Sequence, residues 1–262
     1  MQQSHVKRFT ILMYHMISSP KTTEEVKYAC PPEQFEQHLR YIKDSHHTPV
    51  SLAEVEAYLF SGKSLPDNAV VITLDDGFED NYTQAFPLLQ QYNMPATIFL
   101  VSGVIGGVNE WMSGRNFSER RMLNWQQIEE MNRHNISFGA HTVSHPKLSE
   151  LSDLLAAEEI SQSKQQIEEN LGHACDHFAY PYGLFNDKTC EIVKQSGFKL
   201  ACSTRSGFNN QERDPFTLHR IEVYGNDPVW KLKQKMTFGM NDAFWLFPLK
   251  YYSKRILDRV GF

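Results

Sequence analysis

The chain has 262 residues, of which 41% are hydrophobic and 22% are charged, and this composition excludes a wholly disordered or collagen-like protein. Its uninterrupted apolar runs stay well short of the roughly 18 residues that a membrane-spanning helix needs. The formal net charge of −5 argues against a nucleic-acid-binding protein, because that class usually has a basic balance.

Segments typical of strands alternate with segments typical of helices along most of the chain. Strands are predicted at 9–14, 69–74, 95–101, 136–140, 177–180, 199–203 and 218–223. Helices are predicted at 31–45, 52–60, 81–92, 124–134, 152–171 and 187–196. Ser51 and Glu54 have the spacing of a capping box before the second helix, and Gly172 ends the long helix.

This alternation predicts an α/β fold, with a parallel sheet and covering helices. The seven predicted strands favour a barrel, with an open sheet as the alternative. In both folds, functional side chains gather in the loops that follow the carboxyl ends of the strands.

The N-terminal residues lack the features of a secretory signal. Lys7 and Arg8 precede only a short apolar stretch, whereas a signal has about 7–15 apolar residues and a small-residue cleavage site. The four cysteines have no Cys-x-x-Cys spacing and are predicted to be reduced thiols: Cys30, Cys175, Cys190 and Cys202. We therefore expect a cytoplasmic protein.

Two adjacent carboxylates follow the apolar strand at 69–74. A turn at Gly77 can bring Asp75 and Asp76 into one pocket. Two close carboxylates repel each other unless a cation lies between them, so one is expected to ligate a metal while the other acts as a general base. The structural alternative is an ordinary Asp-Asp-Gly turn between a strand and a helix.

Two histidine pairs have the same spacing of four residues. His141 and His145 directly follow the strand at 136–140, where a tight turn lets both imidazoles reach one metal ion. With Asp76 they would leave coordination positions open, as a catalytic site requires. His173 and His177 instead follow a helix and begin a strand, and they are expected to be surface histidines.

Further polar groups follow other predicted strands. Residues 178–183 read Phe-Ala-Tyr-Pro-Tyr-Gly, which can form an apolar groove wall and direct one backbone N–H at a ligand. His15 is a candidate proton donor or a structural histidine. Arg220 is a candidate ion-pair partner that keeps Asp75 ionised, or else part of a surface ion pair. Together these groups predict a catalytic site at the strand ends.

The residues resemble the polysaccharide deacetylases of carbohydrate esterase family 4, the NodB-homology group. Thr-Leu-Asp-Asp-Gly at 73–77 is similar to the first motif of that family, His-Thr-Val-Ser-His at 141–145 to the second, and Ala-Tyr-Pro-Tyr-Gly at 179–183 to the third. The resemblance covers residues 9–225. It implies a NodB-type distorted barrel, a divalent metal ion and a hydrolase that removes N-acetyl groups from amino sugars.

The sequence departs from the family pattern in two places. Ala179 stands where the third motif usually begins with Arg, and the usual late Leu-x-His motif is not clearly present. Met-Tyr-His-Met-Ile at 13–17 is similar to the start of the branch that includes poly-N-acetylglucosamine deacetylases, which implies that His15 is the general acid. Leu-His-Arg-Ile at 218–221 is similar to a late segment of that branch, so Arg220 would replace the missing Arg. His219 is the alternative acid.

These considerations assign roles to the remaining site residues. The metal ligands are Asp76, His141 and His145, and the metal is expected to be Zn²⁺, with Co²⁺, Ni²⁺ or Mn²⁺ as alternatives. Asp75 is the general base, and the backbone N–H of Tyr182 binds the oxyanion. Apolar contacts to the sugar are expected from Tyr14, Tyr180, Pro181, Tyr182 and Trp125.

The chain is expected to contain a catalytic domain at 1–228 and a basic, aromatic-rich helical extension at 229–262. One expectation is that this extension makes peripheral contact with the anionic inner face of a membrane. The alternative is a final helix that packs its aromatic side chains on the barrel. The expected partner is an N-acetylated poly- or oligosaccharide of the cell envelope, which is lipid-linked if the extension binds a membrane. No nucleic-acid partner is expected. The alternatives are an inactive deacetylase-like carbohydrate-binding module and a deacylase of a different acylated amine.

Overall fold

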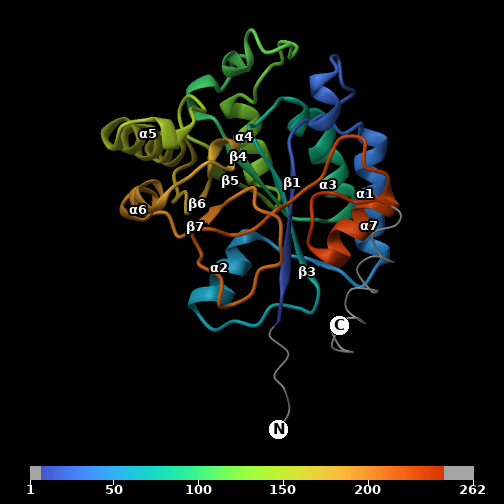
Figure 1. Ribbon diagram of the computed structural model, residues 1–262. Helices are drawn as coiled ribbons and strands as arrows, with labels where there is room; N and C mark the ends of the chain where they lie inside the picture. The colour runs from blue at the N-terminus through green and yellow to red at the C-terminus, as the bar shows by residue number, and fades with distance from the viewer. Residues whose placement is uncertain (1–6, 245–262) are drawn as a thin grey trace, which may run out of the picture.

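The computed structural model describes residues 7–244, and a curved parallel sheet forms its centre (Figure 1). The eight strands are β1 (Phe9–Tyr14), β2 (Thr48–Pro49), β3 (Ala69–Leu74), β4 (Ala96–Leu100), β5 (Ile136–Ala140), β6 (His177–Ala179), β7 (Leu200–Cys202) and β8 (Ile221–Glu222). Their order is β7-β6-β5-β4-β3-β1-β8, and the short β2 pairs with the start of β3. All these pairs are parallel.

The segment that ends in β8 connects the two edges of the sheet. Leu218 pairs in parallel with Cys202 of β7, and β8 itself pairs with β1. Because one short segment contacts both edges, the sheet curls into a distorted (β/α) barrel. This confirms the predicted fold class, including its roughly seven parallel strands.

Helices cover the outside and one end of the barrel. They are α1 (Pro32–Asp44), α2 (Leu52–Phe60), α3 (Phe86–Tyr92), α4 (Trp125–Asn132), α5 (Asp153–Leu171), α6 (Asp187–Gln195) and α7 (Val229–Phe238). Figure 1 shows α1, α3 and α7 on one side of the sheet, α5 and α6 on the other, and α2 at the lower end. The carboxyl ends of the strands therefore point to the upper end, where long loops lie.

Side chains of β1 alternate between two apolar cores. Phe9 and Ile11 belong to the core inside the barrel, which α2 closes from below, whereas Leu12 and Tyr14 belong to the core between the sheet and the helices. Both faces are buried, which explains why the strands read as continuous apolar runs. The alternation directs Tyr14 toward α1, where its ring lies 5.1 Å from that of Phe35.

The predicted helix at 81–92 is divided into two parts. Residues Asn81–Ala85 form a wider π-type turn, and regular α3 begins at Phe86. Pro87 has no N–H to donate to the carbonyl four residues earlier, and a wider turn accommodates that loss. The other predicted elements agree with the structure to within a few residues at their ends, and both the capping box at Ser51 and the C-cap at Gly172 are confirmed. The two-residue β2 was too short to show a pattern.

α7 packs onto the barrel. Leu232 and Met236 lie in the outer core, and the buried Lys235 forms an ion pair with Asp227 and donates to the carbonyl of Glu222 at 2.8 Å. The start of the predicted extension is therefore part of the domain body. Residues 245–262 lie outside the described residues, so their membrane contact and the boundary at 228/229 stay predictions.

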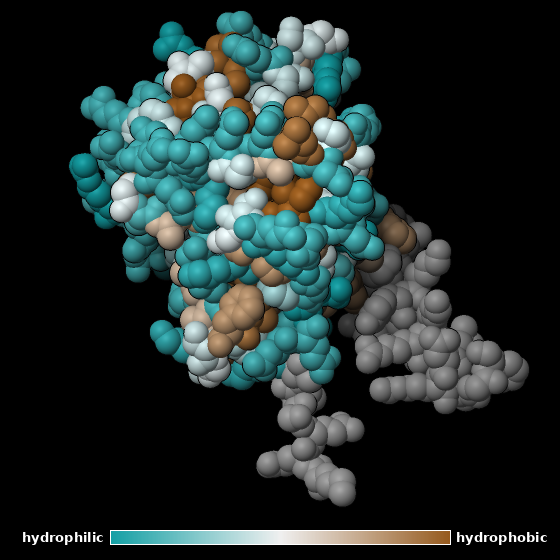
Figure 2. Space-filling view, turned by 90° about the vertical axis from the view of Figure 1, so that its left-hand side faces the viewer, coloured by the Kyte–Doolittle hydropathy of each residue, from teal (hydrophilic) through white to brown (hydrophobic). Residues whose placement is uncertain are grey.

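Within residues 7–244, no helix combines the length and the apolar character that a membrane span requires. Figure 2 shows the α5–α6 side as mainly hydrophilic, with apolar residues in small separate patches. Exposed leucines such as Leu154 and Leu155 at the start of α5 are ordinary on a protein surface.

Candidate metal centre and active site

The first motif forms a tight turn at the carboxyl end of β3. Asp76 and Gly77 both have positive φ, 77° and 81°, a conformation that is uncommon for a residue with a side chain and is concentrated at functional sites. A Cβ on Gly77 would also lie only 2.8 Å from the Leu100 side chain. In a continuing strand, Asp75 and Asp76 would point to opposite faces. The turn instead directs both side chains into one pocket.

The buried guanidinium of Arg220 holds the carboxylate of Asp75. Nη1 donates to Oδ1 at 2.6 Å and Nη2 donates to Oδ2 at 2.7 Å. Burial would raise the pKa of Asp75, but the charge and hydrogen bonds of Arg220 outweigh burial and lower the pKa to about 2. The predicted pairing is therefore present, and Asp75 is ionised at neutral pH.

Three predicted ligands converge beside this pair. His145 Nε2 lies 3.2 Å from His141 Nε2, and Asp76 Oδ1 lies 3.4 Å from His145 Nε2 and 3.6 Å from His141 Nε2. Ligand atoms about 2.05 Å from a tetrahedral cation are about 3.3 Å apart. The three atoms therefore have the mutual spacing that a divalent cation such as zinc requires.

The protonation of the three side chains also suits a cation. The carbonyl of Ala179 can only accept, so His141 donates to it from Nδ1 at 2.7 Å and keeps a lone pair on Nε2. Burial lowers the pKa of His141 to about 4 and that of His145 well below its ordinary value, so both rings are neutral. Burial and the neighbouring Asp75 raise the pKa of Asp76, whose Oδ1 is buried with no hydrogen-bond partner among the described residues. A cation would satisfy this oxygen.

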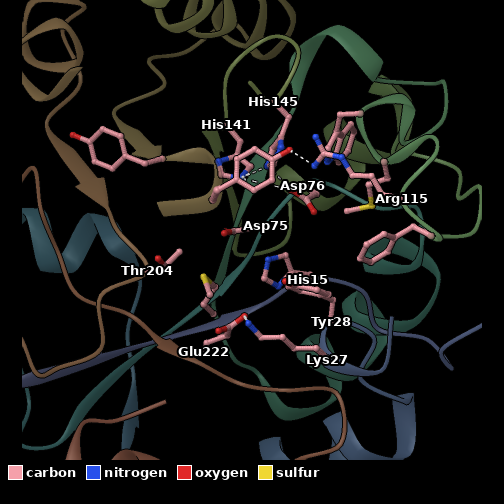
Figure 3. A pocket seen from close by; sticks show the side chains of 16 residues that line it. His15, Lys27, Tyr28, Asp75, Asp76, Arg115, His141, His145, Thr204 and Glu222 are labelled. Atoms are coloured by element: carbon pink, nitrogen blue, oxygen red, sulfur yellow. Dashed lines mark hydrogen bonds and ion pairs between the residues drawn. The ribbon is translucent and has the colours of Figure 1, made fainter. Parts of the chain in front are cut away.

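A cavity of about 290 Å³ opens above these residues. Figure 3 shows Asp76, His141 and His145 on one side of it, Lys27 and Glu222 on the opposite side, and Asp75 and His15 between them. The two outer groups come from different parts of the chain. The first contains the turns after β3 and β5, and the second contains β8 and the segment between β1 and α1. The cavity is thus a gap between candidate metal ligands and a second polar group.

His15 lies directly after β1 and faces this cavity (Figure 3). Its ring packs edge-on against Tyr28, with 5.2 Å between ring centroids. Burial lowers the pKa of His15, while the negative charges of Asp75 and Glu222 act in the opposite direction. The residue therefore has the position that a proton donor at this cavity would need.

The third motif forms another strained turn beside the second. Tyr182 has φ 58°, and the centroid of its ring lies 4.6 Å from that of His145. The hydroxyl of Tyr182 accepts a hydrogen bond from Arg115 at 3.0 Å, and Trp111 contacts His145 with 5.1 Å between centroids. Two aromatic side chains thus flank one of the candidate ligands.

Several predicted substrate contacts lie away from the cavity. Tyr14 is 1% exposed and its side chain faces α1, so it cannot stack on a sugar ring. Trp125 begins α4 and packs against the outer core, and Pro181 is buried behind the third-motif turn. Tyr180 lines the cavity, but its ring is buried and its hydroxyl donates to a backbone carbonyl at 3.1 Å. Of this set, Tyr182 is the side chain that both lines the cavity and is exposed.

The other histidines are also separated from the site. Neighbouring residues of an extended segment point in opposite directions, so His219 points away when Arg220 faces Asp75, and His219 does not line the cavity. This argues against His219 as the acid. His177 Nε2 lies 3.3 Å from a carboxylate oxygen of Glu56, and the exposed His173 contacts Asn132. The prediction of surface histidines therefore holds for His173, whereas His177 is only 6% exposed and is a buried strand residue.

Some residues that line the cavity were not predicted: Lys27, Tyr28, Trp111, Arg115 and Glu222. Glu222 lies two residues after Arg220, so strand alternation would have placed it on the same face. The others come from segments 15–30 and 102–123, where no periodic pattern indicates the direction of a side chain.

Comparisons with known proteins agree with this geometry. A sequence model of the family described as polysaccharide deacetylase matches residues 62–201. The Bacillus subtilis protein YxkH, which is named as a polysaccharide deacetylase, is 29% identical over 216 residues, covering 82% of this chain and 71% of that protein. A poly-beta-1,6-N-acetyl-D-glucosamine N-deacetylase of Staphylococcus aureus is 28% identical over 212 residues, covering 77% of this chain and 70% of that protein.

A solved structure is similar over most of the fold. The Streptococcus pyogenes deacetylase PplD, in complex with acetate, has a TM-score of 0.77 and 29% identity, covering 88% of this chain and 99% of that chain. The family match includes β3 and its Asp-Asp-Gly turn, β5 and its histidine turn, and the third motif. The chain therefore belongs to the polysaccharide deacetylase family, whose members are hydrolases that act on carbon–nitrogen bonds.

Proposed function

We propose that this protein is a metal-dependent enzyme that removes N-acetyl groups from an amino sugar in a poly- or oligosaccharide and releases acetate. The observation that carries the proposal is the placement of an ionised carboxylate, Asp75, beside three neutral or orphaned ligand atoms that face an open cavity. A base next to a cation-binding cluster is the arrangement that amide hydrolysis by water requires.

Asp76, His141 and His145 would hold the cation, and Zn²⁺ suits two imidazoles and one carboxylate best, with Co²⁺, Ni²⁺ or Mn²⁺ as alternatives. When bound, the cation supplies Lewis-acid polarisation of the amide carbonyl and makes water a better nucleophile. The carbonyl of Ala179 fixes the ring of His141 for this task through the hydrogen bond to Nδ1.

Asp75 would receive the proton from the attacking water. Arg220 keeps the carboxylate ionised and holds it in one orientation through two hydrogen bonds, and each carboxylate oxygen retains a further lone pair. The backbone N–H of Tyr182 would donate to the oxygen that becomes negative. His15 in its protonated form, which the negative charges of Asp75 and Glu222 favour against burial, would then give a proton to the sugar nitrogen, because an amine anion is too poor a leaving group to depart alone.

We infer that the substrate is a polymer of N-acetylglucosamine, and β-1,6-linked chains are the first to test, because that is the named substrate of the Staphylococcus aureus relative. A cavity of about 290 Å³ is at the small end of ligand pockets and suits a single sugar unit. Tyr28, Trp111 and Phe117 line it and offer apolar faces to a pyranose ring.

The test is acetate release from β-1,6-linked and β-1,4-linked N-acetylglucosamine oligomers and from the monosaccharide. Release should require added zinc or cobalt and stop with a chelator. Asp75→Asn should lower kcat by about 10³-fold while calorimetry shows unchanged metal binding. His173→Ala, a surface histidine of the other pair, is the matched control and should behave as wild type.

Each part of the proposal has its own contrary result. Release that survives chelation contradicts the metal, and release that survives Asp75→Asn contradicts the base. If no N-acetylated saccharide loses acetate although the protein binds both metal and oligomer, the protein is a carbohydrate-binding module instead. Release only from other acylated amines would move the substrate outside the saccharides.

A further inference from the structure

Two long segments meet at the upper end of the barrel and form one wall of the cavity. Residues 15–30, between β1 and α1, supply His15, Lys27 and Tyr28, and residues 102–123, between β4 and α4, supply Trp111 and Arg115. Figure 1 shows the two segments, in blue and in green, side by side above the sheet. Their contact therefore decides how the two halves of this wall lie relative to each other.

An ion pair is buried between the two segments. Glu25 is 0% exposed and pairs with Arg120, which is 9% exposed. Glu25 also accepts from the backbone N–H of Lys21 at 2.6 Å and of Ser118 at 2.9 Å, and from the Ser118 hydroxyl. Arg120 donates to the Ser18 hydroxyl at 2.8 Å and to the carbonyl of Ser19 at 3.1 Å. Each segment thus bonds to both members of the pair.

The same hydrogen bonds continue to His15. The Ser18 hydroxyl that Arg120 contacts donates to Asp80 at 2.7 Å, and the backbone N–H of Ile17 donates to the other oxygen of Asp80 at 3.0 Å. Asn81 then donates from its side chain to the carbonyl of His15 at 2.9 Å. The backbone of the candidate acid is therefore held from the π-type turn on one side and, through Ser18, from the buried pair on the other.

The energetics separate positioning from stability. Burial would raise the pKa of Glu25, but hydrogen bonds from Arg120 and Ser118 outweigh it and lower the pKa to about 2, so the pair is charged. A buried ion pair generally stabilises a fold no better than apolar side chains of similar volume. What its directional bonds do provide is a single arrangement of the two segments, and a misplacement of about 1 Å at a reacting group can cost about 100-fold in rate.

We propose that Glu25 and Arg120 are positioning residues that join the two segments into one rigid wall and hold His15 where it can protonate the leaving nitrogen. This inference rests on the proposed deacetylation, because it assigns the effect to His15. The hydrogen bonds and the ion pair of Glu25 and Arg120 involve neither the candidate metal ligands nor Asp75.

The test compares two substrates that differ in their need for an acid. An N-acetylglucosamine oligomer has a poor nitrogen leaving group, whereas 4-nitrophenyl acetate has a good leaving group that departs without a proton. Glu25→Gln and Arg120→Met should lower kcat for the oligomer by about 100-fold and leave the ester rate near wild type. His15→Asn should show the same contrast, and Arg120→Lys should recover part of the loss.

Two further variants separate positioning from folding. Ser118→Ala removes one hydroxyl from the cluster without leaving a buried charge unpaired, and it should show a smaller form of the same contrast. Glu56→Gln breaks ion pairs with His177 and Lys199 at the opposite end of the barrel and should change neither rate. Equal loss with both substrates in the Glu25 and Arg120 variants, or wild-type kcat for the oligomer, overturns the proposal.

A measurement without substrate distinguishes failure of this inference from failure of the proposed function. In Glu25→Gln, hydrogen exchange should become faster in both 15–30 and 102–123, while β3 and β5 exchange as before and cobalt binding is unchanged. Faster exchange in one segment alone contradicts the coupling, whatever the substrate proves to be. If the wild-type protein deacetylates no substrate but Glu25→Gln speeds exchange in both segments, the deacetylation and the role of His15 are refuted. The joining of the two segments by Glu25 and Arg120 is then still supported.

Discussion

The two ends of the barrel contain the same sequence signal with different outcomes. At the carboxyl ends of the strands, His141 and His145 face each other with 3.2 Å between their Nε2 atoms. At the opposite end, His177 contacts Glu56 of α2, while His173 contacts Asn132 of α4. Both pairs have a spacing of four residues, so spacing alone does not create a metal site.

The path of the chain between the histidines makes the difference. Thr142 and His145 both have positive φ, 69° and 59°, so the chain after β5 folds back and directs both imidazoles at Asp76. In the other pair, His173 directly follows Gly172, the C-cap of α5, and His177 is the first residue of β6. A metal centre here requires a strained turn after a strand, and a helix end followed by a new strand does not supply one.

Replacement of one histidine in each pair should give the largest difference between the two ends, in metal affinity. His141→Ala or His145→Ala should weaken binding of Co²⁺ or Zn²⁺ by more than about 100-fold, since loss of an outer-shell partner alone costs 10–100-fold in typical sites. His173→Ala and His177→Ala should bind as wild type. Calorimetric titration checks this, and equal weakening in both pairs would contradict the assignment.

A second comparison concerns the charged groups at the two ends. Arg220→Met leaves Asp75 buried without its partner and should lower the free energy of unfolding by about 3–5 kcal/mol. Lys199 pairs with Glu56 and Asp176 but is 51% exposed, so Lys199→Met should cost at most about 1 kcal/mol. Urea unfolding of both variants measures the contrast, and similar losses would show that burial does not govern these ion pairs.

The contribution of a carboxylate to stability should depend on pH more strongly at the cavity end, where Glu25 lies, than at the opposite end, where Glu56 lies. The pKa of Glu25 is lowered from 4.5 to about 2. A carboxylate with a lower pKa in the folded state stabilises at pH above its unfolded value, by about 3 kcal/mol here, of which about 2 kcal/mol is lost by pH 3. The stability gap between wild type and Glu25→Gln should therefore narrow as the pH falls from 5.5 to 3.

Glu56 is the control for this titration. The hydrogen bond from His177 lowers the pKa of Glu56 as well, but this side chain is partly exposed. The difference in unfolding free energy between wild type and Glu56→Gln should therefore change less between pH 5.5 and 3. Urea unfolding at several pH values gives both curves. If the stability difference between wild type and Glu25→Gln stays constant with pH, folding does not lower the pKa of Glu25.

The smallest expected effect lies at the closed end of the barrel. Ser51 and Glu54 form the capping box of α2, and Ser51→Ala should lower the free energy of unfolding by about 1 kcal/mol. Metal binding should not change, because α2 covers the end that lies away from the ligands. A loss of metal affinity in this variant would mean that the two ends are not independent.

The sequence by itself determined the elements, the barrel and the location of the site. Apolar runs, helical periodicity and caps are local signals, and the strands with their Asp-Asp-Gly and His-x-x-x-His turns placed Asp75, Asp76, His141 and His145 at the same end. Local rules also suggested that Arg220 pairs with Asp75. The prediction for Tyr14 was wrong although a local rule covers it, because strand alternation directs Tyr14 and the adjacent His15 to opposite sides, and only His15 faces the site.

Only the tertiary structure decided the other wall of the cavity. Lys27, Trp111 and Arg115 lie in segments without periodicity, whose conformation depends on contacts with each other rather than on their own residues. Glu25 and Arg120, which join those segments, are 95 positions apart in the chain. Hydrogen bonds across such a separation are set by how the whole chain packs, so no local pattern reveals them, whereas a turn at the end of a strand is decided within a few residues.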